Sequence, residues 1–198
     1  MDILPLLDEL RTIALNGLHY TTDPYDRERY EHLLALVSTY YGRALDLPPT
    51  EARRRLGAEF GHITPKIGAE AAIFDDEGRI LLSLRADDGL WGLPGGWSDA
   101  LESPVETAVR ETREETGLIV EPVRLVDVFS WRPSAPKSVY AGVSVVYLCT
   151  VIGGDLAMSH ESRDVRYMSI DAIAENEWHQ RHGDYAKAAR AALLRGQG

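Results

Sequence analysis

A glutamate-rich segment near the middle of the 198-residue chain holds the residues best suited to chemistry. Residues 95–118 read GGWSDALESPVETAVRETREETGL. At about 100° per residue of a helix, Glu111, Glu114 and Glu115 share an arc of about 100°. Three carboxylates beside glycine backbone offer the oxygen ligands that Mg²⁺ prefers. The same spacing also fits a solvated acidic helix face, so the residues by themselves leave both interpretations open.

The helix that must carry these acids has well-marked ends. Ser103 is a good helix cap, Pro104 suits the first helical position, and Glu106 completes a capping box. Gly117 is a typical stop. We therefore predict a helix over residues 104–116.

The helical wheel also predicts what surrounds the acids. Arg110 lies one turn before Glu114, the spacing at which an ion pair forms on a helix. Five residues are expected on the face that packs on a sheet: Val105, Ala108, Val109, Thr112 and Thr116.

The segments around this helix read as strands. Residues 67–74 and 79–85 are short apolar runs joined by a turn at residues 75–78, which is a hairpin signal. Further strands are expected at 123–129, 140–152 and 165–169, followed by helical stretches at 170–176 and 184–194. Strands around one strongly marked helix predict an α+β domain built on a mixed sheet, over residues 63–198.

Residues 1–62 have a different, helical pattern. We expect helices over 2–16, 24–42 and 50–60, with Gly17 and Gly42 as stops for the first two. Each helix has one apolar stripe that needs a partner. A segment this short buries little surface by itself, so we expect it to pack on the rest of the chain or to form a homodimer.

The composition limits the classes of molecule that this protein is expected to bind. With 21 Lys and Arg against 31 Asp and Glu, the net charge is −10, which disfavours nucleic acid and anionic membranes as partners. No apolar stretch is long enough to span a bilayer, and acids interrupt the N-terminal leucines, unlike a signal peptide. The single cysteine, Cys149, excludes an internal disulfide and reads as a buried strand residue. These features predict a cytoplasmic protein.

The acidic segment resembles the signature of the Nudix hydrolase family, the Nudix box. The matching residues are Gly96, Glu102, Arg110, Glu111, Glu114, Glu115, Gly117 and Leu118. Thr112 departs from the pattern, which usually has an aliphatic residue there, although its methyl group can still pack on a sheet. The resemblance implies an α/β/α sandwich that hydrolyses the pyrophosphate of a nucleoside diphosphate linked to another moiety, with Mg²⁺ or Mn²⁺.

The resemblance also implies a role for each matching residue. Glu114 and Glu115 would be the main metal ligands, and Glu111 would bind metal or deprotonate the attacking water. Gly96 would offer its carbonyl oxygen to the metal. Arg110 would orient the glutamates, and Glu102 would support them.

Many family members use a further acid from a later loop. Glu161 is the candidate here and Asp164 the alternative, although either also fits an ordinary surface acid.

The leaving group depends on residues outside the box. Pro133, 15 residues after Leu118, resembles ADP-ribose pyrophosphatases of the family, whereas a turn proline is the simpler interpretation. The N-terminal helices and residues 90–97 resemble a branch that includes a CDP-choline pyrophosphatase. We place ADP-ribose ahead of CDP-choline, with a triphosphate substrate or a non-catalytic ligand sensor as alternatives. Three tryptophans could stack on a base or pack in a core: Trp91, Trp97 and Trp131.

Overall fold

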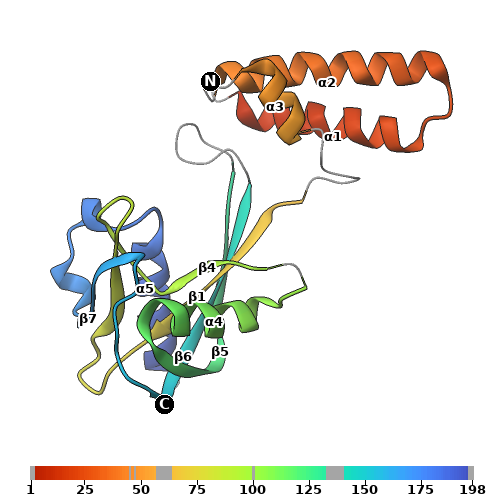
Figure 1. Ribbon diagram of the computed structural model, residues 1–198. Coiled ribbons are helices and arrows are strands. Elements are labelled where there is room, and N and C mark those ends of the chain that lie inside the picture. Colours follow the sequence, from red (N-terminus) through yellow and green to blue (C-terminus); the bar gives the residue numbers. More distant parts are fainter. Residues whose placement is uncertain are drawn as a thin grey trace. The chain divides into compact units, whose positions relative to one another are not determined.

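The computed structural model describes residues 3–44, 46, 48–56, 64–99, 101–132 and 141–195 (Figure 1). The chain forms two compact units. The first comprises Met1–Lys66 and Trp131–Gly142, and the second comprises Ile67–Ser130 and Val143–Gly198.

The first unit contains three helices: α1 (Leu4–Tyr20), α2 (Pro24–Ala44) and α3 (Pro49–Leu56). Asp23 caps α2, because its Oδ1 accepts hydrogen bonds from the backbone N–H of Tyr25 (2.7 Å) and Asp26 (3.2 Å). The helices pack through buried Leu7, Val37 and Tyr41.

The prediction that Gly17 ends the first helix is wrong, because α1 continues to Tyr20. A Cβ at Gly17 would lie 2.4 Å from the ring of Tyr30, so this glycine lets α2 approach α1 closely. Gly42 likewise lies inside α2, and the third helix begins at Pro49, one residue before Thr50. The predicted end of that helix lies outside the described residues.

The second unit is an α+β fold with a mixed sheet, as predicted, and its strands form two sheets. One has the order β4–β1–β6–β5 and the other β3–β2–β7. The strands are β1 (Lys66–Ile73), β2 (Ile80–Arg85), β3 (Trp91–Gly92), β4 (Gly95–Trp97), β5 (Leu118–Trp131), β6 (Gly142–Gly154) and β7 (Ser162–Met168). The helical elements are α4 (Pro104–Thr116), η1 (Ile170–Ala172), η2 (Glu175–Glu177) and α5 (His182–Arg195).

The two faces of β1 pack against different helices. Ala71 and Ile73 belong to an apolar cluster that includes Val109 of α4. Ala72, between them, belongs to the larger cluster that includes Tyr185, Ala186 and Ala189 of α5. Because side chains alternate along a strand, β1 separates an α4 side from an α5 side.

The hairpin expected from the turn at residues 75–78 does not form. The turn itself is present, since the Gly78 N–H donates to the Asp75 carbonyl (3.0 Å). Beyond the single Phe74–Ile80 bridge, however, β1 and β2 enter different sheets. Ala71, Ile73 and Leu81 are all fully buried, so packing between the sheets accounts for apolar runs that also fit a hairpin.

Other predicted boundaries need correction. The strand expected at 123–129 begins at Leu118, directly after the stop at Gly117. The helix expected at 170–176 is two short 3₁₀ turns, η1 and η2. Cys149 is buried in β6 as expected. In the described part of the chain, no helix is both long and apolar enough to cross a membrane.

The catalytic-helix candidate, α4, spans Pro104–Thr116 as predicted. The Glu106 N–H donates to Ser103 Oγ, and the Ser103 N–H donates to Glu106 Oε2 (2.9 Å), so the predicted capping box is present. Gly117 has a φ of 72°, in the left-handed region that favours glycine. These ends fix which turn of the helix carries each glutamate.

A buried histidine ties the start of α5 to the strand region. His182 Nδ1 accepts a hydrogen bond from the Leu93 N–H (2.9 Å), so the ring is neutral. Burial, followed by the nearby His179 and Arg85 charges, lowers the pKa of His182 to about 3.

This histidine makes stability depend on pH. Below its ordinary pKa of about 6.5, the unfolded chain binds a proton that the folded chain rejects. The free energy of unfolding therefore falls as pH decreases from about 6.5 towards 3, by about 1.3 kcal/mol between pH 7 and 5.5 for this group. Urea unfolding followed by tryptophan fluorescence measures it. His182→Gln retains a hydrogen-bond acceptor but cannot bind a proton, so its free energy of unfolding should fall by about 1.3 kcal/mol less than that of the native chain between pH 7 and 5.5. The same pH dependence of stability in the native chain and in the variant would contradict this account.

Candidate active site

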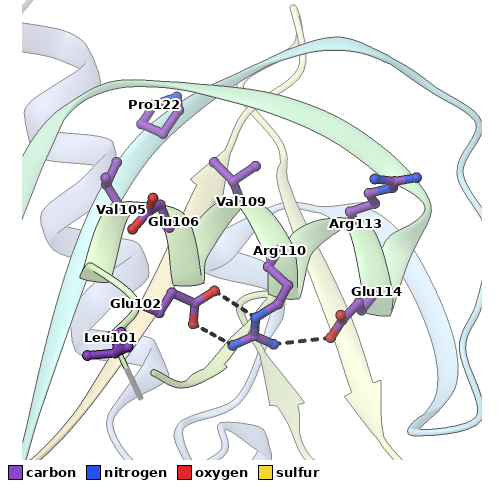
Figure 2. Close-up of a pocket in the computed structure, with 9 residues that line it drawn as sticks. All are labelled: Leu101, Glu102, Val105, Glu106, Val109, Arg110, Arg113, Glu114 and Pro122. Carbon is purple, nitrogen blue, oxygen red and sulfur yellow. Dashed lines mark hydrogen bonds and ion pairs between the residues drawn. The ribbon is translucent and has the colours of Figure 1, made fainter. Parts of the chain in front are cut away.

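Arg110 is the centre of the site's polar contacts. Its guanidinium donates to both oxygens of Glu102 (2.8 and 2.9 Å). It also donates to Glu111 Oε1 (2.8 Å), and its bond to Glu114 Oε2 (3.1 Å) is the ion pair predicted from the sequence. Figure 2 shows Arg110 between Glu102 and Glu114. A fifth bond to the Trp97 carbonyl (3.1 Å) ties the arginine to β4.

Glu102 is fixed by this arrangement. Its bidentate pair with Arg110 is the main cause that lowers the Glu102 pKa, to about 2. Glu102 Oε2 also accepts a hydrogen bond from the Asp99 N–H (3.0 Å). The loop before α4 is thereby held against the middle of the helix.

Glu115 is the most buried of the three helix acids, with 7% of its surface exposed. Its carboxylate accepts a 3.3 Å hydrogen bond from the Gly95 N–H. Burial, followed by repulsion from Glu111, raises its pKa to about 8, although Arg85 opposes that shift. The helical wheel grouped Glu115 with Glu111 and Glu114, whereas its burial shows that its side chain turns towards the packing face.

Glu111 lies over the first glycine of the box. A Cβ on Gly96 would come within 2.5 Å of Glu111 Oε1, so only glycine leaves room for this carboxylate. Burial is the largest cause that raises the Glu111 pKa, and Arg110 opposes it. Glu114 differs from both because its side chain is 60% exposed.

The sheet-facing residues of α4 are partly as predicted. Ala108, Thr112 and Thr116 are buried, and the Thr112 hydroxyl donates to the Ala108 carbonyl (2.7 Å). The threonine that departs from the family pattern therefore packs with its hydroxyl satisfied. Val105 is instead exposed.

The two later acids lie in different surroundings. Glu161 precedes β7, and its charge raises the pKa of both Glu111 and Glu115, so its carboxylate lies near theirs. The Ala86 N–H donates to the Glu161 carbonyl (2.8 Å), which anchors this segment to the end of β2. Asp164 is within β7 and forms an ion pair with Arg166.

Arg85 is a site residue that the sequence analysis missed. It ends β2, forms an ion pair with Asp87 (2.8 Å), and lies close enough to Glu115 to lower that carboxyl's pKa. No helical spacing connects Arg85 to the box. Arg85 is on the three-stranded sheet, whereas Glu115 hydrogen-bonds Gly95 of the four-stranded sheet, so the packing of the two sheets brings them together.

The three tryptophans also separate. Trp91 is buried in the core on the α5 side, which excludes stacking on a substrate. Trp97, on β4, is 51% exposed. Trp131 is partly buried in the first unit, and Pro133 lies outside the described residues.

An open groove of about 990 Å³ follows the outer side of α4 (Figure 2). Its apolar lining comes from Leu101, Val105, Val109 and Pro122. It contacts Glu102, Arg110 and Glu114, but neither Glu111 nor Glu115 lines it. The groove therefore borders the carboxylate site from outside.

The carboxylates suit a hard divalent cation. They supply only oxygen donors, and burial together with repulsion from Glu111 disfavours the charged form of Glu115, which a bound cation would stabilise. Within the described ranges, no three acidic, histidine or cysteine side chains are gathered into a complete metal site. Mg²⁺ fits this arrangement, because it binds few carboxylates and completes its coordination with water and substrate phosphates.

Comparisons with known proteins agree with this geometry. A model of the NUDIX domain matches residues 52–189, and a model described as a UDP-X-like, N-terminal oligomerisation domain matches residues 1–55. YjhB of Bacillus subtilis, provisionally named an ADP-ribose pyrophosphatase, is 33% identical over 165 residues, which cover 83% of this chain and 79% of YjhB.

Two further relatives are named for substrates that differ from each other. A solved UDP-X diphosphatase is 27% identical with a TM-score of 0.59, and the match covers 100% of this chain and 98% of that one. An ADP-ribose pyrophosphatase of Methanocaldococcus jannaschii is 29% identical over 115 residues, which cover 57% of this chain and 66% of that enzyme. The names of these relatives therefore agree on cleavage of a diphosphate and differ in the nucleotide.

The Arg110 contacts predict the effect of a conservative change. Lysine cannot make the bidentate pair to Glu102 together with the bonds to Glu111 and Glu114. Arg110→Lys should lower kcat for diphosphate hydrolysis by about 100-fold, because misplaced catalytic groups cost about that much. Arg113→Lys, an exposed position on the same helix, is the matched control. Equal kcat values for the two variants would show that the Arg110 contacts do not position the site.

Proposed function

This chain belongs to the Nudix hydrolase family, and from that premise we propose that it hydrolyses the diphosphate of a nucleoside diphosphate linked to a second moiety. The observation that carries the proposal is the set of acids around Glu115, held by Arg110 and adjoining Gly95 and Gly96. The alternative of a ligand sensor without catalysis would not require this set to be complete.

We assign metal binding to Glu111, Glu114 and Glu115, with the Gly96 carbonyl oxygen as a further donor. Bound Mg²⁺, or Mn²⁺ in its place, would neutralise the diphosphate and make phosphorus more electrophilic. Arg110 holds Glu111 and Glu114 in position through its two short contacts, so these acids need little rearrangement when substrate binds.

We assign proton acceptance to Glu161. Glu111 is engaged by Arg110, whereas the Glu161 side chain is 63% exposed beside Glu111 and Glu115. An attacking water would transfer a proton to Glu161 as its oxygen bonds to phosphorus. The bond from phosphorus to the bridging oxygen then breaks, which yields a nucleoside monophosphate and a phosphorylated second moiety.

For the leaving group, we propose ADP-ribose first. YjhB supports it because the match spans most of both chains. A UDP-linked substrate is the second candidate, since the UDP-X diphosphatase matches this chain from end to end. CDP-choline has support only from the sequence resemblance.

A substrate panel tests the catalytic proposal. We expect Mg²⁺-dependent hydrolysis of ADP-ribose above that of UDP-glucose, CDP-choline or nucleoside triphosphates. Glu115→Gln should lower kcat at least about 1,000-fold, because it removes a charged metal ligand. Phosphate release is measured with a coupled phosphatase that attacks only the products.

The outcomes of that panel are distinct. Glu121→Gln, an exposed acid on β5, is the control and should keep full activity. Turnover of triphosphates alone would favour a nucleotide-pool enzyme. Ligand-dependent thermal stabilisation without any turnover would favour the sensor.

We further propose that the N-terminal helices join two copies of the chain. Leu6, Ile13 and Tyr20 recur at seven-residue intervals on α1, and each is more than half exposed. Leu7 and Ala14 are on the buried face of α1, which packs in the core of the unit. The three exposed residues therefore form a second apolar stripe, which the core of the unit does not cover. The N-terminal oligomerisation model supports this assignment.

Charge on the stripe should separate the copies. We expect the native chain to have twice its 22.0 kDa mass in light scattering, and Leu6→Glu/Ile13→Glu to have the single-chain mass. Glu28→Ala, at an exposed position of α2, should remain dimeric. A single-chain mass for the native protein, or a double variant that stays dimeric, would refute this interface.

A further inference from the structure

Glu70 is a buried acid that the catalytic assignments do not use. It lies on β1, and only 6% of its surface is exposed. Its Oε1 accepts a hydrogen bond from the Ser144 hydroxyl (2.8 Å), while Oε2 has no hydrogen-bond partner among the described residues. An unsatisfied buried acceptor is costly, so a missing donor is expected at this oxygen.

An exposed aromatic ring lies on the same face of the strands. Glu70 pairs with Gly95 and Gly68 pairs with Trp97 across β1 and β4. Directly opposed residues of antiparallel strands share a face, as do residues two apart, so Trp97 and Glu70 belong to one face. A Cβ on Gly68 would lie 3.6 Å from the Trp97 ring, which places the indole beside a position without a side chain.

This face adjoins the catalytic site through the box glycines. Gly95 lies against Glu70, because a Cβ there would be 2.8 Å from Glu70 Cγ. The N–H of the same glycine donates to Glu115, and the next residue, Gly96, lies under Glu111. Since β4 is the edge strand of its sheet, only this one strand separates Trp97 and Glu70 from the acids of α4 on the other face.

We propose that Trp97 and Glu70 recognise the base of the substrate, with the indole stacking on the base and Glu70 Oε2 accepting a hydrogen bond from an exocyclic amino group. This assignment rests on the proposed function and narrows its substrate class. Adenine, cytosine and guanine carry such a group, whereas uracil presents a carbonyl oxygen at the corresponding edge. The site therefore favours an adenine nucleotide over a uracil nucleotide.

The surrounding bonds set the polarity of this contact. Ser144 donates its hydroxyl hydrogen to Glu70 Oε1, so Oε2 is the oxygen left to accept from a ligand donor. In Glu70→Gln the amide oxygen can keep the bond from Ser144. The NH₂ group then replaces Oε2, which converts an acceptor into a donor that suits the uracil carbonyl.

A matched pair of substrates isolates the base. ADP-glucose and UDP-glucose differ only in the nucleobase, so the ratio of their kcat/KM values reports base selection. We expect the native full-length chain to favour ADP-glucose at least tenfold, and Glu70→Gln to shift that ratio at least tenfold towards UDP-glucose. Glu121→Gln should leave the ratio unchanged. A native ratio near one, or a ratio that Glu70→Gln leaves unaltered, overturns the proposal, since a purely structural defect lowers both values equally.

Two further measurements test the proposal without relying on a buried substitution or on catalysis. Trp97→Ala alters an exposed side chain and should raise KM for both substrates about tenfold without changing their ratio, because stacking accepts any base. Unchanged KM values overturn the stacking assignment. If the native chain cleaves neither of these substrates nor ADP-ribose, the proposed function fails. Binding of adenosine and uridine, measured by ligand-observed NMR, then still tests the base-recognition proposal. Preferential adenosine binding that Glu70→Gln abolishes supports the inference, and equal binding overturns it.

Discussion

The site is organised around a carboxylate that is removed from water beside other carboxylates. Glu115 is nearly buried, and Glu111 and Glu161 add negative charge around it. Such an arrangement is unfavourable unless a cation or a proton compensates it. Arg110 pairs with the charges of Glu111 and Glu114, and Arg85 partly offsets the charge of Glu115. A divalent metal would neutralise the negative charge that remains on these carboxylates.

The fold makes this arrangement possible because the strand beside the acids has glycine at two positions. Gly95 donates its N–H to Glu115, and Gly96 leaves space for the Glu111 carboxylate. The capping box at Ser103 and the left-handed turn at Gly117 set the position of every glutamate along α4. Strand β4 therefore contributes to both sides, with the acids near one face and with Trp97 on the other.

The sequence predicted the parts of this site that depend on local spacing. The limits of α4, its capping box and the Arg110–Glu114 pair all follow from residues within one or two turns. What could not be predicted depends on distant segments. Arg85 lies near Glu115 because the two sheets pack together, and Trp91 is buried while Trp97 is exposed because Trp91 packs with α5. The prediction of a hairpin at residues 75–78 was wrong for the same reason, because two buried strands joined by a turn can enter different sheets.

The central claim is that the buried acids of α4 form a divalent metal site, and direct metal binding tests it without substrate. Mn²⁺ titration of the full-length chain, followed by the electron paramagnetic resonance signal of free Mn²⁺, measures the affinity. The account predicts saturable binding that Glu115→Gln weakens at least tenfold, as expected for loss of a charged ligand, and that Glu121→Gln leaves unchanged. Equal Mn²⁺ affinity in the native chain and in Glu115→Gln would contradict it.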